Sequence, residues 1–298
     1  MTNAVLTTDI QKPIKKKKEK VYITTIRRLL KNKLSVIGIV IIIGLIFMAL
    51  FAPFLATYDP VKQNLVDSEL PMFSNGHWLG TDNYGRDVWS RIVYGSRISL
   101  IVGMTAVALG LLGGIVLGLL GGYYKKLDGI IMRIVDLLFS FPGILLAMLI
   151  IAILGTSLIN VAIAISIWSI PSCARIVRGS VLSIKQKEYI MALKSLGASD
   201  LRIMVRHILP NAFAPIIVFA TMRMGTAILS TASLSYLGLG AQPPSPEWGA
   251  MISQGQNYMW TSPHLTIIPG IAIMLTVFAF NVVGDGLRDA LDPNMDIQ

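Results

Sequence analysis

Few residues in this chain have the types and spacing that catalysis or metal binding requires. The histidines His77, His207 and His264 are far apart in the sequence, and Cys173 is the single cysteine, which rules out an internal disulfide and a cysteine-built metal site. The sequence has no Gly-x-x-x-x-Gly-Lys-Ser/Thr loop that could hold the phosphates of ATP. No Ser/His/Asp arrangement and no pair of carboxylates stands out. We therefore predict no catalytic residue, no metal site and no cofactor bound by this chain itself.

The elements that carry the remaining candidate residues are strongly apolar. Of the 298 residues, 54% are hydrophobic and 14% are charged, whereas a soluble domain carries about 25% charged residues. Six stretches are long and apolar enough to cross a bilayer, which takes about 20 helical residues. They are residues 34–56, 98–122, 137–155, 158–174, 212–234 and 265–283. We predict an all-α membrane protein with six transmembrane helices.

The distribution of basic residues predicts the orientation. With the N-terminus in the cytoplasm, most of the 26 Lys and Arg lie in cytoplasmic segments, and only Lys62, Arg86, Arg91 and Arg97 lie outside. This pattern follows the positive-inside rule and puts both termini in the cytoplasm. The net charge of +10 and the basic run 15–18 are compatible with nucleic-acid binding. Because the run directly precedes an apolar stretch, contact with anionic lipid explains it better. The expected partner is the lipid bilayer, and no nucleic acid.

The connecting segments suggest how the chain is organised. We expect four parts: a basic cytoplasmic N-terminal segment (1–33), a first transmembrane helix with an extracytoplasmic loop (34–96), a five-helix core (97–286) and a cytoplasmic C-terminal tail (287–298). Residues 1–20 are polar and Lys-rich and should be disordered. The outer loop 57–96 is too long for a simple connection and should be ordered. A second outer loop, 235–264, contains the sequence Gln-Pro-Pro-Ser-Pro at 242–246, which cannot be helical.

Glycines recur at every fourth position in the second apolar stretch. Gly110, Gly114, Gly118 and Gly122 would lie on one face of a helix. Two helix backbones can approach closely over such a face. We expect this stripe to pack against a neighbouring helix rather than to bind a ligand.

The inside segment between the fourth and fifth apolar stretches begins with a short helical pattern. Residues 188–196 should form a helix with Tyr189, Leu193 and Leu196 on one face. Gly197 should then allow a sharp turn, because glycine tolerates positive φ.

A second short helix should follow this turn. Ser199 or Asp200 can cap its start, and Pro210 should end it. A short helix that protrudes from a membrane domain can dock in a groove on another protein or lie on the lipid headgroups. The periodicity does not distinguish between these two roles.

Several segments resemble one family of membrane transporters. Glu188, Ala192, Gly197, Ile208, Leu209 and Pro210 match the "EAA" loop of permease subunits of ATP-binding-cassette (ABC) importers, in the form found in peptide permeases. Leu193 departs from that form, which commonly has Ala. Residues 77–100, 233–252 and 280–293 also resemble the family and occur in its order. From about residue 25 to residue 293, the chain resembles the C-type subunit of the dipeptide/oligopeptide/nickel permease family.

This resemblance implies a fold, partners and a function. It implies the type I ABC importer permease fold in the inner (cell) membrane of a bacterium or archaeon. The expected partners are a second homologous permease subunit, two cytoplasmic P-loop ATPase subunits that bind ATP and Mg, and an extracytoplasmic substrate-binding receptor. The chain itself would be non-catalytic. Import of dipeptides or oligopeptides is the leading interpretation, and import of nickel, glutathione or oligosaccharide is the alternative. A remote alternative is an ion-coupled carrier or a channel.

The resemblance also implies which residues serve the function. Segment 188–210 would transmit closure of the ATPases to the membrane helices, through Glu188, Tyr189, Ala192, Gly197, Ile208, Leu209 and Pro210. In the outer loops, the candidates for contact with the receptor or the partner permease are Trp78, Asp82, Arg86, Asp87 and Trp248. Packing within the loops is the alternative role for these residues.

Arg223 is central in the fifth apolar stretch. A charge at that depth costs about 2.5–3.5 kcal/mol on insertion scales, so it should face water or a partner. Arg223 is therefore a candidate for the translocation path or an interface. It can bind the carboxylate of a passing peptide, pair with Asp136, or pair with an acidic group on the partner permease, and we favour the structural or interface roles.

Overall fold

The computed structural model describes residues 21–74 and 76–291. The expected disorder of residues 1–20 and the basic run 15–18 fall outside these ranges. The described residues form helices, connected by turns and loops, with two isolated β-bridges in the loop after the first transmembrane helix. The predicted all-α class is confirmed.

Among the described residues, five helical segments are long and apolar enough to span a membrane. They are α2 (Lys33–Leu50), α4 (Val88–Tyr123), α7 (Leu158–Lys185), the run Asp200–Tyr236, which ends in α10 (Phe213–Tyr236), and α12 (His264–Leu291). Within the described ranges, a sixth span is possible only as a broken pair, α5 (Lys125–Phe139) and α6 (Gly143–Leu154), which are bent by 91°. The prediction of one continuous span over 137–155 is wrong. Pro142 lies at the break, and a proline inside a helix removes a backbone donor and clashes with the preceding turn.

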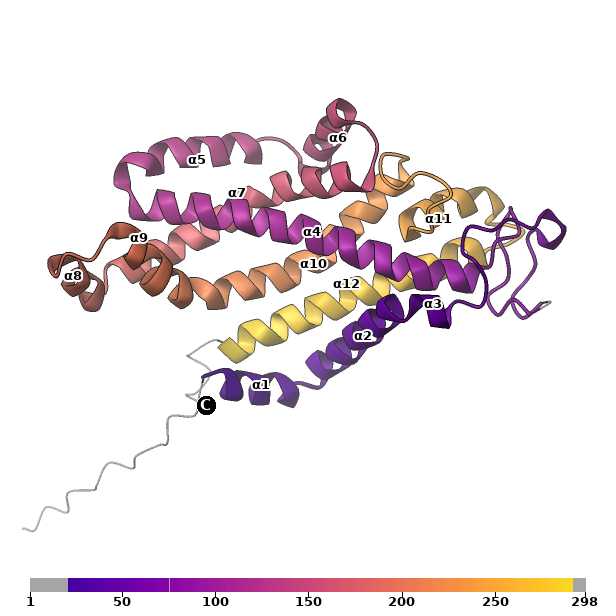
Figure 1. The fold of residues 1–298 in the computed structure, drawn as a ribbon, viewed down its shortest axis with the longest axis horizontal. Helices are drawn as coiled ribbons and strands as arrows, with labels where there is room; N and C mark the ends of the chain where they lie inside the picture. Colours follow the sequence, from indigo (N-terminus) through magenta and orange to yellow (C-terminus); the bar gives the residue numbers. More distant parts are fainter. Residues whose placement is uncertain (1–20, 75, 292–298) are drawn as a thin grey trace, which may run out of the picture.

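The helices form an elongated bundle with two distinct ends (Figure 1). At one end, the "α8 end", lie α1 (Val21–Lys31), α8 (Glu188–Ser195), α9 (Asp200–Ile203) and the last turns of α12. At the other, the "α11 end", lie α3 (Ala52–Leu55), the loop that follows it and α11 (Trp248–Gly255). The segments predicted to be inside thus share one end, and the two predicted outer loops share the other.

The start of α4 differs from the prediction. The helix begins at Val88 rather than near residue 98, because Asp87 caps it and accepts a hydrogen bond from the Ser90 backbone N–H at 2.7 Å. Arg91 and Arg97, predicted to lie in an outer loop, are therefore helical residues. Arg91 is almost fully buried and donates to the carbonyl oxygens of Pro60 and Pro244 at 3.0 and 3.3 Å.

The glycine stripe of α4 packs against α7, as predicted. A Cβ atom added at Gly114 would lie 2.3 Å from Cys173 Cβ, and one at Gly118 would lie 2.7 Å from the carbonyl oxygen of Ala174. Atoms of Ser169 and Val181 crowd Gly110 and Gly122 in the same way. The two helices therefore approach so closely along this face that side chains do not fit between them.

Candidate functional site

The segment at the α8 end has the predicted helix–turn–helix form. Gly197 has a φ of +79° and directly follows the C-cap of α8. The backbone N–H of Ala198 donates to the Leu193 carbonyl oxygen and that of Gly197 to the Lys194 carbonyl oxygen, both at 3.1 Å. This pair of bonds is the Schellman motif, which requires a left-handed residue where Gly197 stands. The turn that aims α8 away from the bundle therefore depends on a glycine.

The side chains predicted to share one face of α8 differ in burial. Ile190 is buried and Leu193 packs beside it, whereas Tyr189 is 40% exposed and Leu196 is 84% exposed. The α9 helix adds Leu201, which is 68% exposed. In a soluble protein, apolar side chains this exposed mark an interaction surface when they gather together. The exposed apolar side chains of this segment are Met191, Leu196, Leu201 and Val205.

Two residues of the EAA-like motif anchor the segment, and the other four are exposed. Ile208 is fully buried and Leu209 packs against the same cluster, which includes Val177 and Val181 of α7. Glu188 and Ala192 are exposed. Glu188 is the first residue of α8, where a negative charge stabilises the positive end of the helix dipole.

The second short helix continues into the membrane span instead of ending at Pro210. Residues Met204–Ile208 form a π-helical turn and Leu209–Ala212 a 3-10 turn, and α10 follows directly. Because Pro210 has no backbone N–H and crowds the carbonyl four residues earlier, a wider turn before it lets the helix pass. The prediction that Pro210 ends the helix is therefore wrong, and α9 and α10 form one helical run.

A hydrogen bond that the sequence did not indicate ties this segment to α4. Ser199 occupies the cap position of α9 but makes no side-chain cap, and Asp200 instead accepts a hydrogen bond from Tyr123 Oη at 2.6 Å. Lys185, at the end of α7, bonds to the carbonyl oxygen of Tyr123. The ends of α4 and α7 and the start of α9 are thus joined at one point.

At the α11 end, charged residues hold the loops together. Asp82 Oδ2 lies 2.6 Å from Arg86 Nε and 3.5 Å from Arg91 Nε, and both arginines are 1% exposed. Arg86 also donates to Gln254 Oε1 of α11 at 2.8 Å. One carboxylate thus lies against two buried cations and offsets part of their charge, and Arg86 links the first outer loop to the second.

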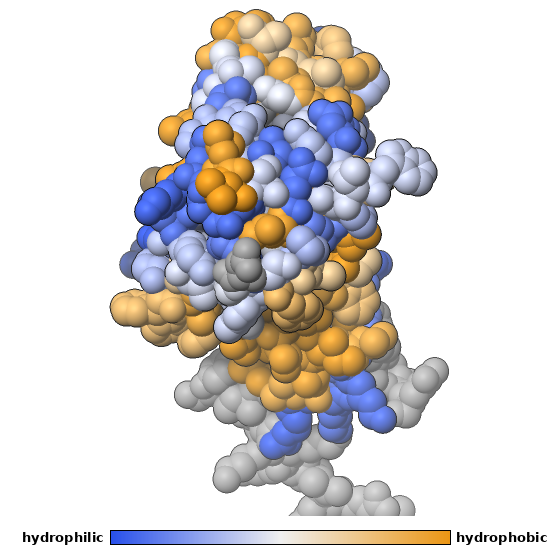
Figure 2. Space-filling model, turned by 90° about the vertical axis from the view of Figure 1, so that its right-hand side faces the viewer, coloured by the Kyte–Doolittle hydropathy of each residue, from blue (hydrophilic) through white to orange (hydrophobic). Residues whose placement is uncertain are grey.

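The neighbouring candidate residues are buried as well. Asp87 lies 2.8 Å from His77 Nδ1, and Trp248 is fully buried and donates to the Ile92 carbonyl oxygen at 3.1 Å. Glu247 directly precedes Trp248 in the sequence. Burial raises the pKa of its carboxyl above the usual value, although hydrogen bonds from the Ala250 and Gly249 backbone act in the opposite direction. Figure 2 looks onto this end, where hydrophilic surface lies across the loops and hydrophobic surface flanks it.

The burial of these residues favours their alternative role, packing within the loops. Asp82, Arg86, Asp87 and Trp248 were candidates for contact with another protein, but the structure places them inside the chain, where they pack the loops together. Trp78 differs, since it is 57% exposed. Its ring lies 5.8 Å from that of Trp89. Among the five candidates, only Trp78 presents a large surface to a partner.

We expect Asp82→Ala to destabilise the protein strongly. The variant leaves Arg86 and Arg91 buried without a counter-charge, and breaking a buried ion pair from one side costs about 3–5 kcal/mol. The apparent Tm in detergent should fall by more than about 5 °C. Asp59→Ala is the matched control, because Asp59 lies in the same loop but is exposed and accepts one local hydrogen bond from the Val61 N–H. Equal Tm values for the two variants would contradict this account of the network.

Of the three partners considered for Arg223, the structure excludes Asp136. Asp136 pairs with Arg175 at 2.6 Å, so it does not neutralise Arg223. The guanidinium Cζ of Arg223 instead lies 5.0 Å from the ring centroid of Trp168, and its Nε is buried without a hydrogen-bond partner among the described residues. Trp168 was not among the residues predicted from the sequence to serve the function. The sequence signal for Trp168 was its position inside an apolar stretch. That position is unusual, because tryptophans of membrane proteins gather at the membrane–water interfaces.

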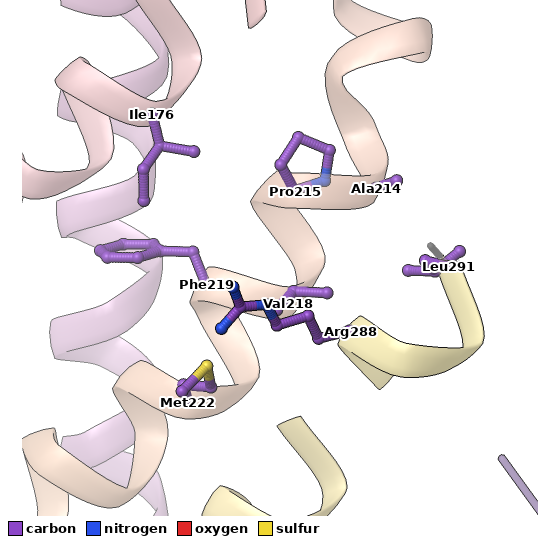
Figure 3. Close-up of a pocket in the computed structure, with 8 residues that line it drawn as sticks. All are labelled: Ile176, Ala214, Pro215, Val218, Phe219, Met222, Arg288 and Leu291. Carbon is purple, nitrogen blue, oxygen red and sulfur yellow. The ribbon is translucent and has the colours of Figure 1, made fainter. Parts of the chain in front are cut away.

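A pocket of about 350 Å³ opens beside α10 toward the α8 end. Its walls are apolar and come from α7, α10 and α12, with Arg288 as the charged exception. In Figure 3 the Arg288 side chain reaches from α12 toward Val218 and Phe219 of α10, with its nitrogens in the pocket. No carboxylate of residues 21–74 and 76–291 pairs with this arginine.

The chain matches two protein-family models. Residues 110–297 match the model described as "Binding-protein-dependent transport system inner membrane component". Residues 23–71 match the N-terminal transmembrane domain of oligopeptide transport permease C. The chain belongs to this permease family. It is therefore a multi-pass inner-membrane protein of bacteria and a non-catalytic membrane subunit of an ABC importer, and it works with ATPase and binding-protein partners.

Curated relatives cover almost the whole permease. It is 50% identical over 274 residues to proteins named "Glutathione transport system permease protein GsiD" from Escherichia coli (strain 536) and Shigella boydii, which covers 90% of this chain and 89% of each relative. The relative of the same name from Pectobacterium atrosepticum is also 50% identical, with 90% of each chain covered. The permease thus belongs to the peptide and glutathione branch of ABC importers.

Solved structures support the fold. The permease resembles a chain of the MetNI methionine ABC transporter in an inward-facing conformation, with a TM-score of 0.56 and 21% identity. The match covers 68% of this chain and 97% of that chain. A second crystal form of the same transporter gives a TM-score of 0.51. The predicted ABC importer permease fold is confirmed.

Proposed function

We propose that this permease imports glutathione or similar short peptides. The observation that carries the proposal is the 50% identity over 90% of the chain to glutathione permeases. It favours glutathione, which the sequence analysis held as an alternative, over dipeptides and oligopeptides in general. The absence of a buried acidic cluster for a coupling ion in the described spans agrees with an importer whose energy comes from partner ATPases.

The proposal includes the route by which the ATPases drive transport. A second homologous permease pairs with this chain, and two P-loop ATPases bind ATP and Mg on the cytoplasmic side. The exposed apolar side chains Met191, Leu196 and Leu201 suit a groove on one ATPase. Movement of α8 then passes through the Gly197 turn to α9. From α9 it reaches α10 through the continuous helical run and α4 through the Tyr123–Asp200 hydrogen bond.

At the opposite end, a substrate-binding receptor delivers the peptide. The loops there are held together by the Asp82 network, so the receptor meets a preformed surface. Trp78 is the exposed candidate for this contact.

Substrate uptake tests the proposal directly. A bacterial strain that lacks this permease should lose receptor-dependent uptake of radiolabelled glutathione by more than about tenfold, because the path itself is missing. Plasmid-borne permease should restore it. Unlabelled dipeptides, tripeptides and glutathione are then compared as competitors. Normal glutathione uptake in the deleted strain, together with lost uptake of a dipeptide, would show that the substrate is a general peptide instead.

A further inference from the structure

A polar stripe runs along one side of α10. Arg223, Thr226, Ser230 and Ser233 follow one another at steps of three or four residues, which places them on the same side of the helix. Thr226 is exposed, and the other three are half-buried. The three hydroxyls donate to carbonyl oxygens of their own helix at 2.8–3.0 Å. Their oxygen lone pairs therefore remain free to accept hydrogen bonds from water or a ligand.

This stripe belongs in an aqueous path rather than in lipid. Ionisable residues within membrane spans face the interior of a bundle or a water-filled cavity. Two pockets lie along α10, and the second includes Ser233 of the stripe. The pocket of Figure 3 is toward the α8 end, and a second of about 440 Å³, lined by Leu229, Ser233 and Tyr236 among others, is toward the α11 end. Along α10, Arg223 directly follows Met222 of the first pocket and precedes Leu229 of the second, although it lines neither pocket itself.

Arg223 is fixed in place but carries no counter-charge. Its guanidinium lies over the Trp168 ring, and no carboxylate of the described residues pairs with it. Trp168 is itself held tightly, since a Cβ atom added at Gly143 would lie 1.7 Å from its Cε2 atom. The glycine at the start of α6 thus makes room for the ring that supports the arginine. The α5–α6 break, α7 and α10 all meet at this point.

We propose that Arg223, supported by Trp168, binds a carboxylate of the peptide as it moves along α10. The inference rests on the proposed function, because it assumes that a peptide is the solute. A guanidinium recognises a carboxylate through two parallel hydrogen bonds, and a free peptide carries a C-terminal carboxylate. The hydroxyls of the stripe accept hydrogen bonds from peptide N–H groups. The arginine therefore selects for anionic solutes inside the membrane, after the receptor has released them.

The test compares solutes that differ only in their carboxylates. The complete transporter, with either wild-type permease or Arg223→Gln, is reconstituted in proteoliposomes with saturating receptor. Uptake is measured for glutathione, for its glycine amide and for its diethyl ester. The receptor is the same throughout, so its own preference cancels in the ratio of variant to wild type.

The Gln variant should lower glutathione uptake by about 10–100-fold, which corresponds to the loss of a charge-assisted hydrogen bond. Arg223→Gln should lower uptake much less for a form of glutathione that lacks the carboxylate bound by Arg223. Arg223→Lys should give an intermediate result, because lysine keeps the charge but loses the planar fork. If the Arg223→Gln protein does not accumulate in the membrane, the Arg223→Lys protein can still be compared with wild type.

Arg175→Gln is the matched control. Arg175 lies on α7 and already has a carboxylate partner, Asp136, so its loss should change uptake of all three forms by the same factor. An equal loss for all three forms in Arg223→Gln would instead assign Arg223 to an acidic group on the partner permease and overturn the proposal. An unchanged uptake would also overturn it. If the wild-type transporter imports another peptide but not glutathione, the proposal that glutathione is the substrate fails. The role of Arg223 is then tested separately, by comparing uptake of that peptide with uptake of its C-terminal amide.

Discussion

A Gly197→Val variant of the permease is expected to insert and fold but to lose more than about nine-tenths of its transport. Gly197 has a φ of +79°, where a β-branched residue is a severe outlier. A left-handed backbone costs an ordinary residue about 1–2 kcal/mol, and each 1.4 kcal/mol changes a population about tenfold. Ile190 is the one buried residue of α8, so the turn should rearrange before the bundle does. The α8 helix would then no longer meet the ATPase in a productive orientation.

The controls separate the backbone effect from the added volume. A Cβ atom meets nothing within 4 Å at either Gly197 or Gly179, but Gly179 lies in the regular helix α7. Gly179→Val should therefore transport normally. Gly197→Asn should retain much of its activity, because asparagine tolerates positive φ better than valine does. Receptor-dependent uptake and co-purification of the ATPases are the two measurements. Normal values of both in Gly197→Val would contradict the role of this turn.

The apolar runs predicted the membrane spans well wherever a helix is straight. Hydropathy reports whether a stretch is apolar, but not whether it continues in one direction. The stretch 137–155 was therefore predicted as one helix, whereas the structure divides it at Pro142 and uses residues 125–139 as the first half. The error at Pro210 was the opposite. A helix end was predicted there, but a π-helical turn accommodates the proline within a continuous helix. A proline alone does not reveal which of these outcomes the surrounding packing favours.

The outer loops show what charge patterns fail to predict. Arg91 looked like a loop residue because it is charged, yet it is a buried helical residue paired with Asp82. That pairing joins residues that are neighbours only after the loop has folded. The glycine at 197 was different, since its effect is local to the backbone. Local signals such as the turn and the glycine stripe were therefore predicted correctly, and long-range ones such as Arg223 with Trp168 were not.

The second large effect is expected at the contact between α4 and α7, for Gly118→Val. The Cβ atom of this valine would lie 2.6 Å from Val177 Cβ and 2.7 Å from the carbonyl oxygen of Ala174. The carbonyl belongs to the backbone of α7, so no side-chain rotation relieves the overlap, and the helices must separate. Overpacking a core costs about 1–3 kcal/mol and sometimes more, against a total stability of about 5–15 kcal/mol. We expect little monodisperse protein in detergent and a Tm lowered by more than about 5 °C.

Two alanine variants on the same helix give the matched comparison. At Gly121 the nearest atom to an added Cβ is Ile131 Cγ2 at 3.6 Å, which is an ordinary contact. Gly121→Ala should therefore leave Tm unchanged or raise it slightly, because alanine favours the helix over glycine by about 1 kcal/mol. Gly118→Ala gains the same propensity but adds its methyl group against α7, so its Tm should fall. Equal Tm values for the two alanine variants would mean that the close approach at the glycine stripe is not what holds α4 against α7.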